Sequence, residues 1–327
     1  MKYRTLGKTG WKVSEVSLGA WQIGGKWGSD FDASLAERII HKAIDSGVNF
    51  IDTADVYSGG LSENIVAKVV KSRTERVIVA TKIGRRLHPH TAEGYNRENL
   101  TRFVEEALQN MNRDAIDLVQ LHCPPSAVYD HAEVFGVMDD LRAQGKIRQY
   151  GVSVETVDEA LKAIEYPGVA TVQIIFNLMR LKPAEVFFPA AKNANVGIIA
   201  RVPLASGLLT GKFSAETVFG EEDHRHFNRE GEAFDKGETF SGVPYAQGLR
   251  AVKEYKRLFG EDFLVQHALQ WILMHEAISC VIPGASSPEH VASNVQASAL
   301  PALPEMAMRD AQAVYDKFVR PSVHDLW

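Results

Sequence analysis

The stretch NFIDTADVY, residues 49–57, begins as an apolar run and ends in Asp52, Asp55 and Tyr57. A run of this kind is typical of a buried strand. An isolated ionised carboxylate taken out of water must find a partner or give up its charge. If the run is buried, Asp52 therefore needs a cation from elsewhere in the chain.

Short apolar runs rich in Val and Ile alternate along the whole chain with segments in which apolar residues recur every three or four positions. The runs predict strands over residues 13–19, 49–55, 77–84, 116–122, 147–154, 171–177, 196–202 and 278–284. The intervening helical patterns include 35–47, 98–112 and 133–146, with Gly47 and Gly145 where C-terminal caps belong. Continuous apolar strands joined by helix-length segments indicate parallel pairing.

Eight β–α units of similar size predict a (β/α)₈ TIM barrel, with residues 1–327 forming a single domain. A doubly wound open sheet is the less favoured alternative, because no Gly-x-Gly-x-x-Gly follows the first predicted strand. Three features lie outside the eight units: an N-terminal cap segment, extra helices, and a long charged loop after the seventh strand at 205–244. Such loops are usually lids or binding loops.

Composition predicts a soluble globular protein, with 45% hydrophobic and 24% charged residues. The formal net charge is -5 and no dense Lys/Arg block is present, so nucleic acid and anionic membranes are not expected partners. No apolar stretch approaches the roughly 20 residues of a membrane helix. Cys123 and Cys280 lack CxxC spacing, which suits a reduced, cytoplasmic setting. We expect a monomer that acts on small molecules.

Polar residues at strand ends carry the functional prediction, since the active site of a TIM barrel lies at the carboxyl ends of its strands. Lys82 lies in the third apolar run, next to the strand of Asp52, and the two are expected to pair. The ammonium group is expected to lower the pKa of Tyr57 and so make it a usable acid. His122, at the end of the fourth run, adds a hydrogen-bond donor.

Tyr57 and His122 together suit a carbonyl oxygen that must be held and protonated as negative charge develops on it. None of the residues is a nucleophile placed to attack the carbon, so hydride from a bound nicotinamide fits. Taken singly, Asp52–Lys82 is also an ordinary structural ion pair and His122 an ordinary core histidine. Their position at the same end of three consecutive strands favours a site.

The segments NFIDTADVYSGGLSE (49–63), VATKIG (79–84), LVQLHCP (118–124) and GKIRQYGVS (145–153) resemble, in order, signature segments of the aldo-keto reductase superfamily. The likeness runs from residue 4 to residue 294 and includes the bacterial and potassium-channel β-subunit-like branch. It implies that Tyr57 is the general acid, that Lys82 and Asp52 tune it, and that His122 orients the carbonyl. It also implies NADPH, with NADH possible, bound in extended form without a Rossmann domain.

The resemblance further implies a set of cofactor contacts, drawn from strand ends, the loop after strand seven and the segment 284–294. They are Gly19, Trp21, Asp52, Ser153, Gln173, Arg201, Pro203, Leu204, Ser206, Gly207, Leu209, Lys212, Gly284, Ser286, His290 and Asn294. Trp21, Trp27, Tyr57 and His88 are expected to line the substrate pocket. No metal is expected.

Three positions depart from the family pattern. Arg201 stands where many members stack an aromatic ring on the nicotinamide, and Val154 replaces a common asparagine. Ser286 stands where many relatives carry an arginine against the 2′-phosphate, although Lys212 and His290 can supply positive charge. NADPH is therefore favoured and NADH kept open.

Four functions compete at this level. The leading one is hydride transfer between NAD(P)H and an aldehyde, ketone or sugar. The second is a nicotinamide-binding redox sensor with little turnover, since fold does not imply function. The third is a Schiff-base lyase with Lys82 as nucleophile. A metal hydrolase built on His88, His90, Asp52 and His122 is the weakest, because histidines in a loop are usually surface residues.

Overall fold

The computed structural model of the protein describes residues 1–24 and 30–327. Its centre is a parallel barrel whose strands pair in chain order. The strands are β3 (Leu18–Gly19), β4 (Phe50–Asp52), β5 (Ile78–Ile83), β6 (Ile116–His122), β7 (Ile147–Ser153), β8 (Val169–Ile175), β9 (Gly197–Arg201) and β10 (Ile278–Val281). Parallel bridges Val16–Val281 and Gly19–Gly284 join the last strand to the first. The predicted TIM barrel is confirmed.

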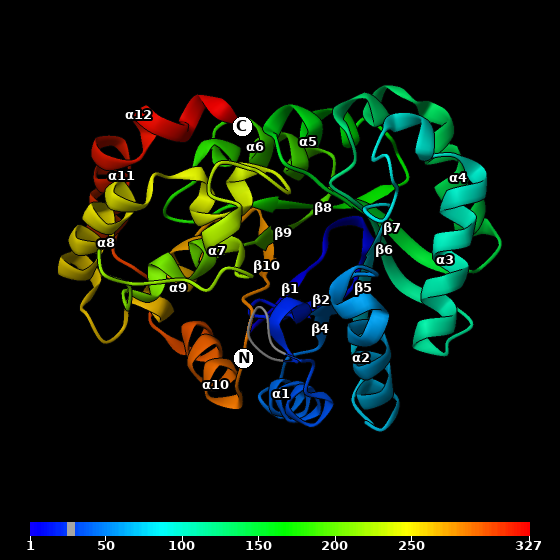
Figure 1. The fold of residues 1–327 in the computed structure, drawn as a ribbon, viewed down its shortest axis with the longest axis horizontal. Coiled ribbons are helices and arrows are strands. Elements are labelled where there is room, and N and C mark those ends of the chain that lie inside the picture. The colour runs from blue at the N-terminus through cyan, green and yellow to red at the C-terminus, as the bar shows by residue number, and fades with distance from the viewer. Residues whose placement is uncertain (25–29) are drawn as a thin grey trace.

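The helices surround this barrel (Figure 1). They are α1 (Ala33–Asp45), α2 (Leu61–Lys71), α3 (Arg97–Met111), α4 (Ala132–Ala143), α5 (Val157–Ala163), α6 (Phe187–Asn193), α7 (His224–Phe227), α8 (Tyr245–Phe259), α9 (Leu264–Leu273), α10 (Pro288–Val295), α11 (Glu305–Phe318) and α12 (Arg320–Val323). Gly47 and Gly145 follow α1 and α4 with φ of 88° and 77°. This left-handed conformation ends a helix at little cost when the residue is glycine, as predicted.

The first predicted strand, 13–19, is wrong as one element. Its beginning, β2 (Lys12–Ser14), pairs antiparallel with β1 (Tyr3–Thr5), and the barrel strand β3 starts only at Leu18. The chain turns between the two, where the Ser17 hydroxyl donates to the Ser14 carbonyl at 2.7 Å. Leu6 and Val13 of this hairpin pack on Phe50 and Ile78, the first residues of β4 and β5, so the hairpin closes the amino end of the barrel.

Strand register places the polar residues at the opposite end. Lys82 pairs in register with Gln120, His122 with Ser153, and Ser153 with Gln173. Because parallel strands present equivalent positions at the same level, the side chains that end successive strands converge at the carboxyl end of the barrel.

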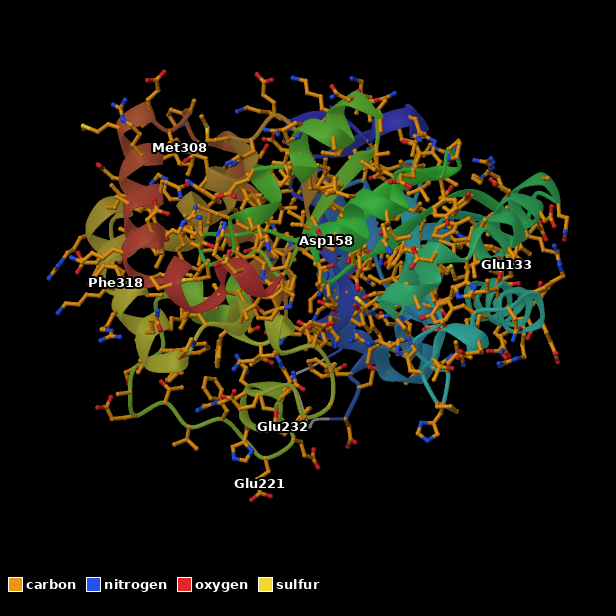
Figure 2. The ribbon with its side chains drawn as sticks, turned by 90° about the horizontal axis from the view of Figure 1, so that it is seen from above. Glu133, Asp158, Glu221, Glu232, Met308 and Phe318 are labelled. Atoms are coloured by element: carbon orange, nitrogen blue, oxygen red, sulfur yellow. The ribbon has the colours of Figure 1, made fainter. Side chains whose placement is uncertain are left out.

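The loop 205–244 folds back on itself through α7 and short 3₁₀ turns. Its two ends are joined, since the Ser206 hydroxyl donates to the Glu238 carbonyl at 2.9 Å and accepts from the Phe240 amide at 3.1 Å. Glu221 and Glu232 mark its outer edge, where it projects from the molecule (Figure 2). In the described ranges, no helix has the length and apolar character to cross a membrane.

Candidate active site

The structure brings Lys82 and Asp52 together as a buried ion pair. The Lys82 Nζ atom lies 2.6 Å from Asp52 Oδ2 and 2.9 Å from the Thr53 carbonyl oxygen. The two side chains are 2% and 3% exposed. Lys82 is thus the cation that the carboxylate after the apolar run required. Without it, a charge at this depth would be strongly destabilising.

Tyr57 completes the chain of contacts. Its hydroxyl accepts from Lys82 Nζ at 3.1 Å, and it begins a 3₁₀ turn, Tyr57–Gly60, that follows β4. Burial raises the pKa of Tyr57, and the nearby Lys82 ammonium only partly offsets this effect. The expectation of a lowered tyrosine pKa is therefore wrong, because desolvation outweighs the ion-pair partner. Tyr57 is protonated at neutral pH.

Lys82 is charged at neutral pH for a complementary reason. Burial alone would lower its pKa, but Asp52 and Tyr57 outweigh that effect and raise it. The second Asp52 oxygen, Oδ1, accepts from Gln120 Nε2 at 3.1 Å and from Gln173 Nε2 at 2.8 Å. Gln173, implied above as a cofactor contact, thus uses its amide N–H groups within the protein. The hydrogen bonds from Gln120 and Gln173 hold the Asp52 carboxylate in place, and this carboxylate in turn holds the Lys82 ammonium.

His122 faces the tyrosine from the end of β6. The two rings meet edge to face, with centroids 6.1 Å apart. Burial, together with the charges of Arg85 and Lys82, lowers the pKa of His122 well below its usual range, so the imidazole is neutral. Arg85 Nη1 lies 3.4 Å from His122 Nε2. Since a guanidinium can only donate, hydrogen-bond donors are present at this end of the site whichever tautomer the histidine adopts.

Two largely buried ion pairs lie beside His122, and sequence reasoning missed most of their members. Arg201 donates to Glu155 Oε2 at 2.7 Å, and Arg85 donates through both Nη atoms to Glu238 Oε1 at 2.9 Å. Arg201 Nη1 is also 3.7 Å from Glu238 Oε1. Arg85 and Glu155 each follow a predicted strand within a few residues, so the strand-end criterion could have found them. Glu238 lies in the long loop and carries no such signal.

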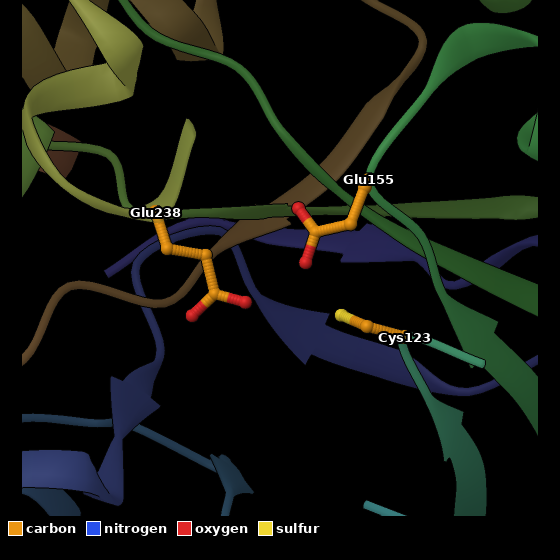
Figure 3. Close-up of side chains that lie close together, drawn as sticks. All are labelled: Cys123, Glu155 and Glu238. Atoms are coloured by element: carbon orange, nitrogen blue, oxygen red, sulfur yellow. The ribbon is translucent and has the colours of Figure 1, made fainter. Parts of the chain in front are cut away.

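Glu155 and Glu238 converge with Cys123 from separate segments (Figure 3). Their ligand atoms lie within 4.8 Å of one another, a spacing that a metal ion could span. The chemistry of the group does not favour a cation, because Arg201 and Arg85 already face these side chains and burial raises the pKa of Glu155 to about 8. Burial also raises the pKa of the Cys123 thiol, which keeps it protonated. We therefore infer no metal centre here.

The residues implied as phosphate contacts gather at the start of α10. Ser287 caps this helix, and Ser286 Oγ lies 3.3 Å from His290 Nδ1. Burial and the nearby charge of Lys212 lower the pKa of His290. The imidazole is therefore neutral at neutral pH, so His290 does not supply the expected positive charge, and Lys212 is the cation near this helix. Helix N-terminal amides with an adjacent lysine suit a phosphate. This end of the structure fits a dinucleotide cofactor.

The other implied cofactor positions lie between that helix and the carboxyl ends of the strands. Asn294 Nδ2 donates to the Gly284 carbonyl at 3.2 Å, and Gly284 bridges to Gly19 where the barrel closes. Ser206 and Gly207 adopt left-handed conformations in the turn after β9. That turn also carries the remaining positions, Pro203, Leu204 and Leu209. Ser153 is buried at the end of β7, with its hydroxyl 3.6 Å from Cys123 Sγ.

Aromatic rings form one wall of the site. Trp21 stacks on Tyr57 with centroids 6.2 Å apart and lies 5.2 Å from the ring of His224 in the long loop. Trp27, expected in the same wall, lies outside the described residues. His88 is exposed on its loop, whereas His90 bonds the Tyr95 hydroxyl at 2.8 Å. In the described part of the chain these two histidines do not form a metal-ligand group with Asp52 and His122.

The chain folds as a (β/α)₈ barrel with Asp52, Lys82, Tyr57 and His122 grouped at the carboxyl ends of its strands. The chain itself belongs to the aldo/keto reductase family, whose sequence model, described as "Aldo/keto reductase family", matches residues 15–316. The resemblance of the signature segments is thereby confirmed.

Individual relatives agree with this assignment. The aldo-keto reductase YhdN of Bacillus subtilis is 30% identical over 88% of this chain and 86% of its own length. A probable voltage-gated potassium channel subunit beta of Arabidopsis thaliana is 27% identical over 98% and 99%. The structure of the glycerol dehydrogenase AKR11B4 from Gluconobacter oxydans superimposes with a TM-score of 0.79 at 27% identity, covering 97% of this chain and 96% of that one.

Proposed function

We propose that this protein is an NAD(P)H-dependent oxidoreductase that reversibly transfers hydride between a nicotinamide and the carbonyl carbon of an aldehyde, ketone or sugar. The observation that carries the proposal is the position of Lys82 Nζ, 2.6 Å from Asp52 and 3.1 Å from the Tyr57 hydroxyl. A protonated phenol held against a buried ammonium is suited to give up its proton at the moment when charge develops on a nearby oxygen.

Each of the site residues has a separate role in the proposed reduction. Tyr57 donates its proton to the carbonyl oxygen, and the Lys82 ammonium stabilises the phenolate that remains. The His122–Arg85 pair supplies the second donor to the same oxygen. The nicotinamide, when bound, supplies the hydride. Asp52, fixed by Gln120 and Gln173, keeps Lys82 charged and in place.

We propose NADPH as the preferred cofactor, with NADH also accepted. Ser286 and His290 lie at the N-terminus of α10, and Lys212 is near enough for its charge to lower the pKa of His290; a lysine together with backbone amides favours a phosphate. The arginine that many relatives carry at the position of Ser286 is missing, so the preference is expected to be moderate. We also propose that the protein is a cytoplasmic monomer, in keeping with its two free cysteines.

The alternatives are less well supported. A Schiff-base lyase needs a neutral amine, whereas the pKa of Lys82 is raised by Asp52 and Tyr57. A redox-sensing barrel remains the second candidate, because two relatives are named as a probable voltage-gated potassium channel subunit beta. The chemistry-competent arrangement of Tyr57, Lys82 and His122 favours turnover over sensing.

The test follows the absorbance of NADPH and NADH during incubation with aldehydes, ketones and sugars, for the native protein and Tyr57→Phe. Phenylalanine keeps the ring and removes the proton donor. We expect a loss of about 10²- to 10⁴-fold in kcat with cofactor binding retained. Cofactor binding without turnover on any carbonyl would favour the sensor, and no binding of either nucleotide would refute the proposal.

A further inference from the structure

Arg85 has an ion-pair arrangement that the hydride-transfer proposal does not require. It follows β5 closely, and its Nη1 and Nη2 atoms both donate to one oxygen, Glu238 Oε1, at 2.9 Å. The same Nη1 lies 3.4 Å from His122 Nε2. A guanidinium fork holding a carboxylate oxygen therefore stands within reach of the position that the carbonyl oxygen would occupy.

The Oε1 atom of Glu238 lies between two guanidinium groups, those of Arg85 and Arg201, and we call this place the cationic slot. Arg201 Nη1 lies 3.7 Å from the oxygen. Burial alone would raise the pKa of Glu238, but Arg85 and Arg201 outweigh burial and lower it to about 2. An anion is thus strongly favoured at this point of the site.

The anion now in the slot comes from the loop and not from the barrel. At the strand ends, Lys82 pairs with Asp52 and Arg201 pairs with Glu155. Arg85, among the described residues, has its ion-pair partner in Glu238 of the 205–244 loop. If Glu238 leaves with its loop, Arg85 keeps its position beside His122 but loses its counter-charge.

We propose that Arg85 is the anchor for a carboxylate on the carbon next to the substrate carbonyl, so that the preferred substrates are 2-oxo acids, and that Glu238 occupies this position when no such substrate is bound. The inference rests on the proposed function, since it assigns a substrate class to the same site. Guanidinium and carboxylate match in a two-pronged geometry that confers specificity as well as affinity.

The position of the slot selects this class over neutral sugars. A 2-oxo acid carries its carboxylate one bond from the carbonyl carbon, and Arg85 lies directly beside His122, which with Tyr57 defines the carbonyl position. A neutral polyol would leave the ion pair between Arg85 and Glu238 in place and gain nothing from the guanidinium fork.

The first experiment compares 2-oxobutyrate with its methyl ester, which keeps the ketone and removes the charge. We expect kcat/KM of the native protein to favour the acid by about 10- to 100-fold, the range for hydrogen bonds to a charged group. In Arg85→Gln the ratio of acid to ester should fall by a similar factor, mainly through KM. Arg97→Gln, which removes an exposed arginine paired with Asp140 on the outer helices, is the matched control and should keep the native ratio.

The second experiment measures binding of oxamate to the NADPH complex by calorimetry and needs no turnover. Oxamate should bind the native protein, fail to bind Arg85→Gln, and bind Glu238→Gln more tightly by about tenfold, because the competing carboxylate is removed. Arg85→Lys keeps the positive charge but lacks the paired N–H groups of a guanidinium, so it should bind oxamate only weakly. This variant preserves the test if Arg85→Gln does not fold.

Equal kcat/KM for acid and ester in the native protein, or an equal loss of both in Arg85→Gln, would overturn the inference and leave Arg85 with only its role beside His122, while leaving the reductase proposal intact. If no carbonyl is turned over but oxamate still binds through Arg85, the proposed reductase fails and the anion site stands. Absence of oxamate binding in both the native protein and Glu238→Gln would refute the site.

Discussion

The Lys82 ammonium donates to the Tyr57 hydroxyl across 3.1 Å, although the two residues come from different β–α units. A tyrosine in this setting has two opposing influences on its acidity. Burial raises its pKa and the cation lowers it, and burial has the larger effect. Tyr57 therefore keeps its proton at neutral pH, and in the proposed reduction Lys82 acts chiefly by stabilising the phenolate that remains once Tyr57 has given up its proton.

The first prediction concerns pH. Because the pKa of Tyr57 is raised above its usual value, the acid form persists through the neutral and mildly alkaline range. The kcat/KM for carbonyl reduction should stay nearly constant from about pH 6 to about pH 9 with respect to this group. A fall in kcat/KM with an apparent pKa of about 7 to 8 would contradict this prediction if the residual activity of Tyr57→Phe did not show the same fall. It would indicate that the pKa of the phenol is lowered.

The second prediction concerns the buried pair. Lys82→Met leaves Asp52 buried without its cation and should lower the free energy of unfolding by about 3–5 kcal/mol. Adding Asp52→Asn should restore most of that loss, because neither buried group is then charged. Urea unfolding of both variants is the measurement. The exposed pair Lys68–Glu37 is the control, and Lys68→Met should cost no more than about 1 kcal/mol. A double variant no more stable than Lys82→Met would refute the argument.

The third prediction concerns Asp55, whose carboxylate accepts from Arg86 Nε at 3.0 Å. Burial raises its pKa from 3.8 to about 7, more than Arg86 lowers it. The folded state therefore holds a proton that the unfolded chain releases near pH 4. Stability from this group is present below that pH and is lost as pH rises towards 7.

Asp55→Asn removes this dependence. The native protein should lose stability from this group as pH rises, whereas the variant should not. The unfolding free energy of the variant minus that of the native protein should therefore rise by about 2–4 kcal/mol from pH 4 to pH 8. Urea unfolding at a series of pH values measures the difference. A difference that does not change with pH would show that Asp55 titrates alike in the folded and unfolded chains.

The fourth prediction concerns the cofactor. Lys212→Gln should weaken NADPH binding by about tenfold and NADH binding by about twofold or less, since only NADPH carries the 2′-phosphate. Ser286→Arg should act in the opposite direction and tighten NADPH binding. Fluorescence titration with each nucleotide checks both. An equal effect of Lys212→Gln on the two nucleotides would place the lysine on the shared pyrophosphate instead.

The fifth prediction concerns Trp327. Its indole N–H donates to Asp235 Oδ1 at 2.9 Å, and the guanidinium of Arg180 lies 3.8 Å from the ring centroid. Trp327→Ala should lower the unfolding free energy by about 1–3 kcal/mol through the loss of both contacts. Trp327→Phe keeps an aromatic face and should lose less. Thermal unfolding of the pair separates the two contributions, and identical losses would exclude a contribution from the ring.

The sequence by itself predicted the barrel, because the alternation of apolar runs with helical periodicity is a local signal that each segment carries alone. It also predicted the Asp52–Lys82 pair, since buried charges on neighbouring strands have few other partners. The first strand was wrong because a hairpin strand and a barrel strand have the same local pattern. Only the turn at Ser14–Ser17 separates them.

Only the tertiary structure decided the two features that bear most on chemistry. The acidity of Tyr57 depends on how closely other atoms exclude water from it, which sequence spacing does not reveal. The slot between Arg85 and Arg201 depends on Glu238, which reaches it from a loop more than 100 residues away from Arg85 in the chain. The sequence thus determined which charged residues end the strands, whereas long-range packing determined which of them meet and how strongly each holds its proton.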